Sequence, residues 1–372
     1  MNTRPETPGR VSDLDREIAA AARILEHGGL VAFPTETVYG LGADAENPVA
    51  VGAIYAAKGR PANHPLIVHL ATNADPGYWS SNVNIPAQKL IAAFWPGPLT
   101  LILPRATHIS DVVTGGQASI GLRCPAHPVA QALLHTFKTG GGGIAAPSAN
   151  RFGHVSPTTA SHVREEFRDS PWVGCILEGG QSAVGIESTI LDLTRDRPVL
   201  LRPGGISSVE IAELLGVMPG TPDVQAPRVS GSLASHYAPR TPVALVSTGQ
   251  LPQTLKILLA LGRRVALMHH TVFAAGDLYA ADAALGSSTS VATHAWPAKI
   301  EMAGNLVRRA MPSDPSAYAH DLYAVLRQLD QAGTDMILVE ALPKSNDWQA
   351  VGDRLTRAAH GSESVLQHLI GA

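Results

Sequence analysis

Short apolar runs alternate along the chain with segments in which apolar residues recur at helical spacing. Residues 30–33 form a run of the first kind, and residues 18–25, which follow a capping pair at Ser12 and Asp15, show helical spacing. Mixed strands and helices without a strict strand–helix–strand period favour an α/β or α+β sheet over a helix bundle. Up to residue 216 we expect strands at residues 30–33, 65–70, 100–103, 119–123, 143–146, 175–177, 187–193 and 199–201, and helices at residues 49–58, 87–94, 129–137, 158–167 and 209–215.

A stretch rich in Pro, Gly and Ser, residues 216–235, interrupts this pattern and is typical of a linker. The length of 372 residues also favours two domains. We therefore expect a first domain at residues 1–216, a linker at residues 217–240 and a second domain at residues 241–372. The second domain has predicted strands at residues 242–247, 264–269 and 336–342, and predicted helices at residues 254–262, 298–332 (broken near Pro312) and 348–359. Such units predict a small doubly wound domain.

Charge and composition narrow the possible functions. The 28 Lys and Arg against 31 Asp and Glu give a net charge of −3, whereas proteins that bind long stretches of nucleic acid normally have a basic excess. The two cysteines are too few for a disulfide framework and indicate a reducing compartment. The polar N-terminus is not typical of a secretory signal, and no apolar run approaches the ~18–20 residues of a membrane span. We therefore expect a cytoplasmic protein without a membrane segment.

Two polar loops follow predicted elements in the first part of the chain. FPTETVYGLG, residues 33–42, places the hydroxyls of Thr35 and Thr37 and the carboxylate of Glu36 in one turn, either as a cap on a helix start or as part of a site. KGRPANHPL, residues 58–66, carries Lys58 and Arg60 at a helix end. These cations either complement the helix dipole in solvent or bind phosphate, for which arginine offers a rigid fork and lysine a point charge.

A third loop, APSANRFGHVSPT at residues 146–158, carries small donors at Ser148, Asn150 and Ser156. A turn before the next helix explains only the end of this string. The chain has no Walker A motif, no strand-linked G-x-G-x-x-G, no H-E-x-x-H and no C-x-x-C. No set of His, Cys, Asp and Glu has metal-ligand spacing, so we expect no protein-bound metal.

Three further residues stand in or at the end of apolar strand runs. Arg123 and Arg202 each end such a run, where an arginine is either an edge charge or a ligand clamp. His69 lies inside PLIVHL, and a single histidine in a strand is more often a core group than a ligand. The residues themselves leave both alternatives open.

Taken in order, these strings resemble the YrdC/Sua-five family, the threonylcarbamoyl-AMP synthases of tRNA modification. The strings are PTETVYGLG, K-x-R-P with HPLIVH, WPGPLT, R-x-P-A-H-P, PSAN, SPT, G-x-EST and LRPG, and they run from about residue 30 to residue 205. Eight motifs in the family's order are specific, although each alone is weak. HYAP, residues 236–239, and the second domain are similar to the longer Sua-five form.

The resemblance implies both a fold and an activity. The fold would be an α/β, YrdC-like twisted mixed sheet with a concave pocket, joined to a smaller Rossmann-like C-terminal Sua-five domain. The enzyme would condense L-threonine, bicarbonate and ATP into L-threonylcarbamoyladenylate and release pyrophosphate, with Mg²⁺ carried by the ATP. A partner transferase would then modify adenosine 37 of tRNAs that read ANN codons, and no stable nucleic-acid complex is expected.

The same resemblance assigns the site. The family's K-x-R motif falls on Lys58 and Arg60, the expected catalytic cations. The threonine pocket would use Thr35, His69, Arg123 and Ser188. The ATP side would use Lys58, Arg60, His64, Ser148, Asn150, Ser156, Arg202, His236 and Tyr237, the last two on a linker that closes over the nucleotide. The linker departs from the family's P-G-M-K-Y-x-H-Y-A-P: it reads SGSLASHYAP, with Ser230 in place of the proline.

Two other functions use the same residues differently. An RNA-binding module would bind RNA in the basic pocket without turnover, but the near-neutral charge and the 5% content of aromatic residues count against it. A carbamoyl-transfer domain acting on carbamoyl phosphate would resemble the hydrogenase-maturation relatives that share the YrdC module. The zinc-finger and acylphosphatase segments of those proteins are not found in this sequence.

Overall fold

The larger of two sheets has nine strands, in a computed structural model that describes residues 12–231, 233–271 and 301–371. The strand order is β7-β1-β2-β6-β3-β5-β4-β8-β9, and parallel and antiparallel neighbours are mixed. The strands are β1 Leu30–Phe33, β2 Gly40–Asp44, β3 Ile67–His69, β4 Leu99–Pro104, β5 Ser119–Arg123, β6 Ile144–Ala145, β7 Val173–Ile176, β8 Thr189–Asp192 and β9 Val199–Arg202. The central strands are buried at nearly every position, so both faces of the sheet are covered.

The helices that accompany this sheet begin and end at the capping residues that the sequence offers. They are α1 Asp13–Glu26, α2 Pro48–Lys58, α3 Pro76–Trp79, α4 Ile85–Phe94, α5 Pro128–Thr136, α6 Ala160–Glu166 and α7 Ser208–Leu215, with a short 3₁₀ turn, η1, at Phe137–Gly140. The predicted first helix is confirmed, with Ser12 and Asp15 forming its capping box. Helix α2 ends at Gly59, whose φ of 62° turns the chain immediately after Lys58.

The second sheet has five strands in the order β10-β14-β11-β13-β12. Its strands are β10 Val243–Val246, β11 Val265–His269, β12 Glu301–Ala303, β13 Leu306–Ala310 and β14 Met336–Glu340. All pairs are parallel except β12 with β13 at one edge, which confirms the Rossmann-like expectation. Its helices are α8 Leu251–Ala260, α9 Pro315–Asp330, α10 Gln349–Ala358 and α11 Glu363–Ile370, with a 3₁₀ turn, η3, at Asn346–Trp348.

The predicted long helix at residues 298–332 is wrong over its first part. Residues 301–310 form the hairpin of β12 and β13, which turns at Gly304 and Asn305, and residues 298–300 lie outside the described chain. Gly304 has a φ of 57°, and a Gly-Asn pair is a turn signal that outweighs the helical spacing around it. The helix begins only at Pro315, where the side chain of Asp314 accepts from the backbone N–H of Ala317.

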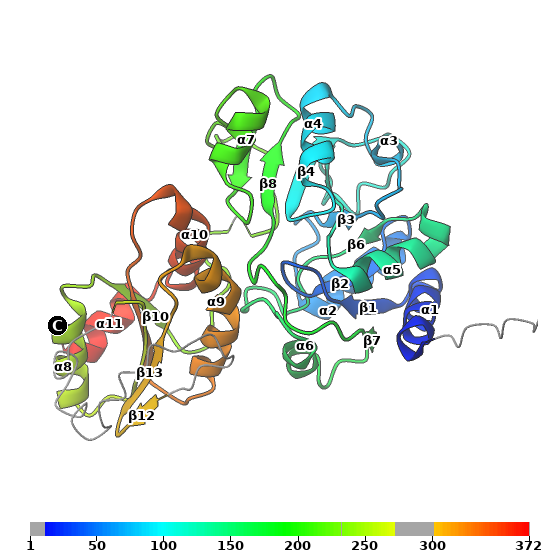
Figure 1. Ribbon diagram of the computed structural model, residues 1–372. Coiled ribbons are helices and arrows are strands. Elements are labelled where there is room, and N and C mark those ends of the chain that lie inside the picture. Colours follow the sequence, from blue (N-terminus) through cyan, green and yellow to red (C-terminus); the bar gives the residue numbers. More distant parts are fainter. Residues whose placement is uncertain (1–11, 232, 272–300, 372) are drawn as a thin grey trace, which may run out of the picture.

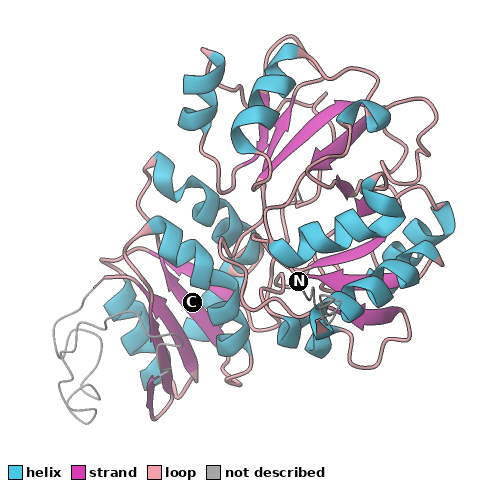
Figure 2. Ribbon diagram, turned by 45° about the vertical axis from the view of Figure 1, so that its right-hand side comes forward, coloured by secondary structure: helices cyan, strands magenta, loops and turns pink. Residues whose placement is uncertain are grey.

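The two sheets lie in separate parts of the molecule, with α9 and α10 on the side of the second sheet that faces the first (Figures 1 and 2). An apolar cluster joins the two parts, and we call it the interdomain cluster. It includes Val38, Val155, Ile186 and Tyr237 from the first part and linker, and Tyr318, Ala319, Leu322, Tyr323 and Leu326 from α9. No helix within the described ranges is long and apolar enough to cross a membrane.

Gly185 shows how closely α9 approaches the first sheet's loops. Its φ is 81°, and a Cβ at this position would lie 2.5 Å from the carbonyl oxygens of Ala319 and His320. Only a residue without a side chain allows the two backbones to approach this closely. The glycine of the G-x-EST string therefore sits at the contact between the two domains.

Candidate active site

Eight of the predicted site residues line one small cavity, which we call the central cavity. Its volume is about 40 Å³, and it lies where the turn after β1, the ends of β3 and β5, the loop after β6 and the linker meet. The eight are Thr35, His69, Arg123, Ser148, Ser188, Arg202, His236 and Tyr237. Residues more than 200 positions apart in the sequence are thus brought together, as the resemblance implied.

The turn that follows β1 is built around the hydroxyl of Thr35. Its Oγ1 donates to the carbonyl of Val38 at 2.6 Å and accepts from the backbone N–H of Val38 and of Thr37, both at 3.2 Å. The alternative of a helix cap is wrong, because the next element is strand β2. The turn instead places the side chains of Thr35 and Thr37 at the cavity.

Arg123 ends β5 and is held by three contacts. Its Nη2 lies 2.7 Å from Oε1 of Glu36, its Nη1 donates to Oγ1 of Thr37 at 2.9 Å, and its Nε donates to the carbonyl of Gly97 at 3.3 Å. The other oxygen of Glu36 accepts from the N–H of Ala126 at 3.0 Å. A guanidinium has five N–H groups, so one on each terminal nitrogen is left for a ligand. Arg123 is a fixed side chain at the cavity wall and not an edge charge.

His69 lies beside Arg123, because β3 and β5 are parallel and the two residues are register partners. Burial and the charge of Arg123 lower the pKa of His69 to about 3. The imidazole is therefore neutral at physiological pH, and it contacts the ring of Phe33 edge-on at 6.0 Å. His69 is both a core residue and a cavity residue, so the two alternatives for it do not exclude each other.

Arg202 ends β9 and joins Ser188 to the linker. Its Nε donates to the carbonyl of Ser188 at 3.0 Å, its Nη2 to the hydroxyl of Ser188 at 3.1 Å, and its Nη1 to the carbonyl of Ser230 at 2.8 Å. The hydroxyl of Ser188 also lies 2.8 Å from that of Thr100. Ser230, the residue that departs from the family's proline, thus contributes its backbone to the site.

Lys58 and Arg60 are buried, so the alternative of cations in solvent is wrong. Nζ of Lys58 donates to the carbonyl of Ser148 at 2.6 Å and to that of Asn150. Nη2 of Arg60 donates to the carbonyl of Pro65 at 2.9 Å. Burial and the charge of Arg60 lower the pKa of Lys58 well below its usual value, and burial lowers the pKa of Arg60 to about 10. Both groups lose hydration without forming an ion pair with any carboxylate of residues 12–231, 233–271 and 301–371, which is a costly arrangement typical of anion sites.

Five predicted residues do not line the central cavity: Lys58, Arg60, His64, Asn150 and Ser156. They lie behind its wall. The amide of Asn150 donates to the carbonyls of Arg151 and His154, and so holds its own loop. The ring of His64 contacts Phe152 edge-on at 5.4 Å.

Tyr237 of the linker covers the cavity in an unusual conformation. Its φ is 60°, a left-handed value that costs a bulky residue free energy and is kept only where the surroundings enforce it. Its ring stacks on Tyr323 at 5.6 Å, and the guanidinium of Arg354 lies 5.4 Å from its centre. Burial lowers the pKa of the neighbouring His236 to about 3. The second domain therefore holds the linker against the site.

Glu187 is a site residue that the sequence assignment missed. One oxygen accepts from the hydroxyl of Ser156 at 2.6 Å, and the other from the hydroxyl of Tyr323 at 2.8 Å and from Nε of Arg354 at 2.9 Å. Burial alone would raise its pKa, but the charges of Arg354 and Arg202 and the bond from Ser156 hold it at about 2. The resemblance did not assign Glu36 and Thr37 either, although the sequence places both beside Thr35 in a turn that could be part of a site. Nothing in the local sequence marks Tyr323 or Arg354.

The charges around the cavity divide into two groups. Within the described chain, the carboxylates of Glu36 and Glu187 each pair with an arginine, whereas Lys58, Arg60 and Arg202 donate only to backbone carbonyls and to the hydroxyl of Ser188. Cations with neutral partners keep their charge available to a ligand. A mixed sheet with such a pocket, covered by a linker, is typical of a protein that binds an anionic ligand.

Comparison with known proteins identifies the family. A family described as "Telomere recombination", the Sua5/YciO/YrdC group, matches residues 23–204, and the family "Threonylcarbamoyl-AMP synthase, C-terminal domain" matches residues 206–360. The threonylcarbamoyl-AMP synthase of Pyrococcus abyssi is 36% identical over 92% of this chain and 94% of its own length, and that of Bacillus subtilis is 38% identical over 94% and 95%. The chain belongs to the threonylcarbamoyl-AMP synthase family in its two-domain form.

The fold agrees with this family. The crystal structure of P. abyssi Sua5 complexed with L-threonine has a TM-score of 0.78 to this chain at 33% identity, and the match covers 94% of this chain and 96% of that one. The family, the fold class and the adenylate-forming activity expected from the motifs are confirmed. The division at residues 216 and 240 and the role of each site residue stay predictions.

Proposed function

We propose that the central cavity and the cations behind its wall form the site at which this chain condenses L-threonine, bicarbonate and ATP into L-threonylcarbamoyladenylate. The observation that carries this proposal is that Lys58, Arg60 and Arg202 have only neutral partners within the described chain, beside a cavity that also holds the carboxylate-binding candidate Arg123. Such a site neutralises phosphate charge and orients a small amino acid next to it.

The reaction needs positioning more than covalent catalysis. The threonine amine forms a bond to the carbon of carbon dioxide, which bicarbonate supplies with loss of water, and it releases a proton. A carbamate oxygen then attacks the α-phosphorus of ATP, and the bond from that phosphorus to the bridging oxygen of pyrophosphate breaks. Negative charge grows on the departing pyrophosphate, and fixed cations stabilise it most. The products are threonylcarbamoyladenylate, pyrophosphate and water.

On the threonine side, Arg123 would bind the substrate carboxylate with its two remaining N–H groups. The hydroxyls of Thr35 and Ser188 would bind the threonine side chain or the carbamate. Neutral His69 would pack against the amino acid without adding charge. A site that hydrogen-bonds the threonine hydroxyl disfavours valine, because valine would leave buried polar groups unpaired.

On the ATP side, Lys58 and Arg60 would bind the phosphates, and Ser148, Asn150, Ser156, His64 and Arg202 would shape the loop around the nucleotide. The central cavity of about 40 Å³ is far below the ~300 Å³ or more of typical small-ligand pockets. His236 and Tyr237 would therefore move outward to admit ATP and return to shield the labile product from water. The linker at residues 217–240 would act as this cover.

Magnesium would arrive on the ATP phosphates. Within residues 12–231, 233–271 and 301–371, no group of three or more His, Cys, Asp and Glu could hold a metal ion, and both cavity carboxylates already contact arginines. Mg²⁺ bound by the phosphate oxygens and water would then be part of the nucleotide substrate. Its assignment as the ion used stays a proposal.

The product is labile, so we propose that a cytoplasmic threonylcarbamoyl transferase takes it up and modifies tRNA adenosine 37. Pure protein incubated with ATP, Mg²⁺ and bicarbonate tests the proposal directly. We expect pyrophosphate release that depends on L-threonine and bicarbonate, together with the mass of threonylcarbamoyladenylate. Folded protein without threonine-dependent release contradicts the proposal, and salt-dependent RNA binding without turnover would support an RNA-binding module instead.

Substituting Arg123→Lys tests the threonine side. Lysine keeps a positive charge beside buried Glu36, but a single ammonium cannot bind Glu36, Thr37 and a substrate carboxylate in the same geometry. We expect KM for L-threonine to rise by about tenfold or more while KM for ATP stays nearly constant, measured by pyrophosphate release. Arg164→Lys, at an exposed ion pair with Glu178, is the matched control. A change in KM for ATP alone would indicate that Arg123 binds the nucleotide and not L-threonine.

A further inference from the structure

The position of Lys58 depends on a loop whose first residues are held at the start of strand β2: the N–H of Ala149 donates to the carbonyl of Tyr39 at 2.8 Å, and Ser148 forms a β-bridge with Gly40. Residues 148–155, which we call the Lys58 loop, supply the carbonyls of Ser148 and Asn150 to Nζ of Lys58. The N–H of Phe152 in turn donates to the carbonyl of Lys58 at 2.9 Å. The loop and the lysine therefore hold each other, and a shift of one moves the other.

The outer side of this loop borders a large cavity. The cavity has a volume of about 590 Å³, lies between the two domains, and is lined by Arg151, His154 and Val155 of the loop, by the end of α6 and by α9. On this side the linker also holds the loop, because the N–H of Ala238 donates to the carbonyl of Gly153 at 2.9 Å. An open cavity offers no close packing, so polar side-chain contacts from its walls add to this support.

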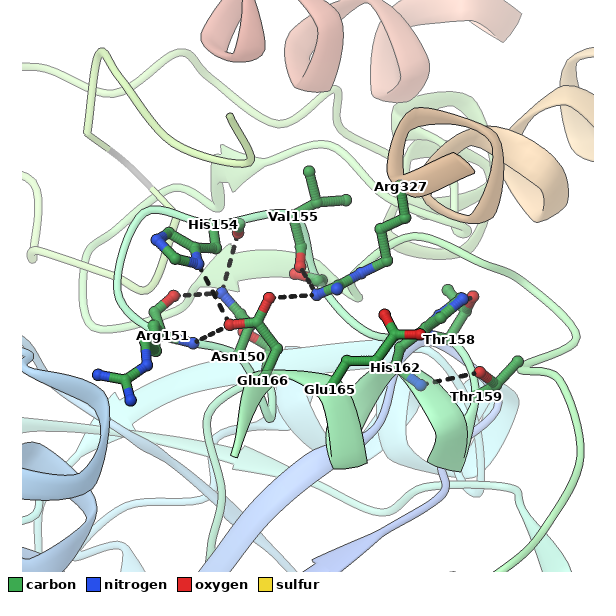
Figure 3. Close-up of polar contacts among 12 residues, drawn as sticks. Asn150, Arg151, His154, Val155, Thr158, Thr159, His162, Glu165, Glu166 and Arg327 are labelled. Atoms are coloured by element: carbon green, nitrogen blue, oxygen red, sulfur yellow. Dashed lines mark hydrogen bonds and ion pairs between the residues drawn. The ribbon is translucent and has the colours of Figure 1, made fainter. Parts of the chain in front are cut away.

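Glu166, the last residue of α6, provides those contacts (Figure 3). Its Oε2 accepts from the backbone N–H of Arg151 at 3.0 Å and lies 3.2 Å from Nδ1 of His154. Its Oε1 accepts from Nη2 of Arg327 at 2.9 Å. One carboxylate thus binds both ends of a four-residue stretch of the loop and a side chain of the second domain.

Arg327 adds a contact of its own to the loop. The same Nη2 that binds Glu166 also donates to the carbonyl of Val155. Arg327 lies on α9 one turn after Tyr323, so this face of the helix contacts Glu166 and Glu187 in succession. The second domain therefore contacts the loop directly, and not only through the linker.

We propose that Glu166 and Arg327 are positioning residues for Lys58: they fix the Lys58 loop from outside and make the placement of this cation depend on the docked second domain. This inference rests on the proposed function, in which Lys58 binds the ATP phosphates. Neither residue lines the central cavity, and the polar side-chain contacts of both are with the Lys58 loop and with each other.

The electrostatics of the pair agree with this geometry. Burial would raise the pKa of Glu166, but the bond to His154, the charge of Arg327 and the N–H of Arg151 hold it at about 2. The carboxylate is therefore ionised throughout the neutral range. Its charge also acts on Lys58, where it opposes the lowering of the pKa by burial and by Arg60.

The test compares Glu166→Gln and Arg327→Met in the full chain with the unchanged protein. Glu166→Gln removes the charge from three contacts and Arg327→Met removes two hydrogen bonds, so we expect KM for ATP to rise about tenfold or more, while KM for L-threonine changes less than about twofold. Arg327→Lys should restore much of the loss, because both bonds of Arg327 start at one nitrogen that an ammonium can replace. The double variant should cost no more than the worse single one, because the two residues act through one contact.

Glu165→Gln is the matched control. Glu165 is the neighbouring residue on α6, is exposed and accepts from Gln331 at 3.2 Å, so its loss should leave both KM values unchanged. The positioning role would be overturned if Glu165→Gln raised KM for ATP as much as Glu166→Gln and Arg327→Met do. It would also be overturned if Glu166→Gln and Arg327→Met raised KM for ATP and KM for L-threonine equally. If Glu166→Gln lowers the melting temperature too far for kinetics, KM for ATP is compared between Arg327→Lys and Arg327→Met. A lower KM in Arg327→Lys supports the positioning role, and equal values contradict it. An inactive unchanged protein would instead contradict the proposed function itself.

Discussion

Substituting Lys58→Ala is expected to reduce threonine-dependent pyrophosphate release by about 10²–10³-fold or more, the usual cost of losing one fixed charge donor in a closed site. The ammonium is buried against two backbone carbonyls, and within the described residues it forms no ion pair with a carboxylate. Its charge is therefore available to the phosphates of ATP. Arg60→Ala should act in the same direction, because Arg60 is likewise buried with a neutral partner.

The fold should survive this change. Alanine leaves the carbonyls of Ser148 and Asn150 without a donor, but it also removes the cost of a buried, poorly solvated charge. Circular dichroism should show a cooperative thermal transition close to that of the unchanged protein. Lys89→Ala, at an exposed position on α4, should change neither pyrophosphate release nor the thermal transition. Retained turnover, or loss of the cooperative transition, would show that Lys58 is structural.

Ending the chain after Gly216 is expected to uncouple pyrophosphate release from product accumulation. The shortened chain lacks Tyr323 and Arg354, which bind Glu187, and the linker carbonyl of Ser230, which binds Arg202. Without the cover formed by Tyr237, water also reaches the intermediate. We therefore expect lower turnover and a lower ratio of threonylcarbamoyladenylate to pyrophosphate, measured together by mass spectrometry and a pyrophosphate assay.

Arg354→Met in the full chain separates these two causes. It removes the partner of Glu187 but leaves the linker and the rest of the second domain in place. If shielding by the linker dominates, the ratio of product to pyrophosphate should fall less in this variant than in the shortened chain. A shortened chain with full activity and an unchanged ratio would show that neither the linker nor the second domain serves the reaction.

The sequence patterns correctly predicted the helices and strands that depend mainly on neighbouring residues. The helix behind Ser12 and most strands of the first sheet were predicted within a few residues, because caps and apolar runs act over short distances. Strand β2, Gly40–Asp44, was missed: it contains two glycines and no β-branched residue, and it exists because β1 and β6 pair with it on both sides. Helix α11 was also missed.

The site residues likewise include some that local motifs identify and others whose contacts depend on the folded chain. The motifs named Thr35, Arg123 and Arg202, each of which ends a strand or follows one, and the structure brings all three to the central cavity. The contact of Glu187 with Arg354 joins residues 167 positions apart, and neither has a local pattern that names its partner. The placement of Lys58 behind the cavity wall likewise depends on how the loop after β6 folds back onto α2, which spacing along the chain does not encode.

The interdomain cluster shows that the linker in the sequence does not separate two independent hydrophobic cores. The composition of residues 216–235 marks a division in covalent structure, yet α9 packs its apolar side chains against both parts of the molecule. Val38 and Ile186 of the first part are solvent-shielded by the helix of the second. Cooperative unfolding follows shared cores and not linkers. The stability of each sheet's part is therefore coupled to the other through this cluster, and a second domain exchanged from a relative would have to present matching apolar side chains along α9.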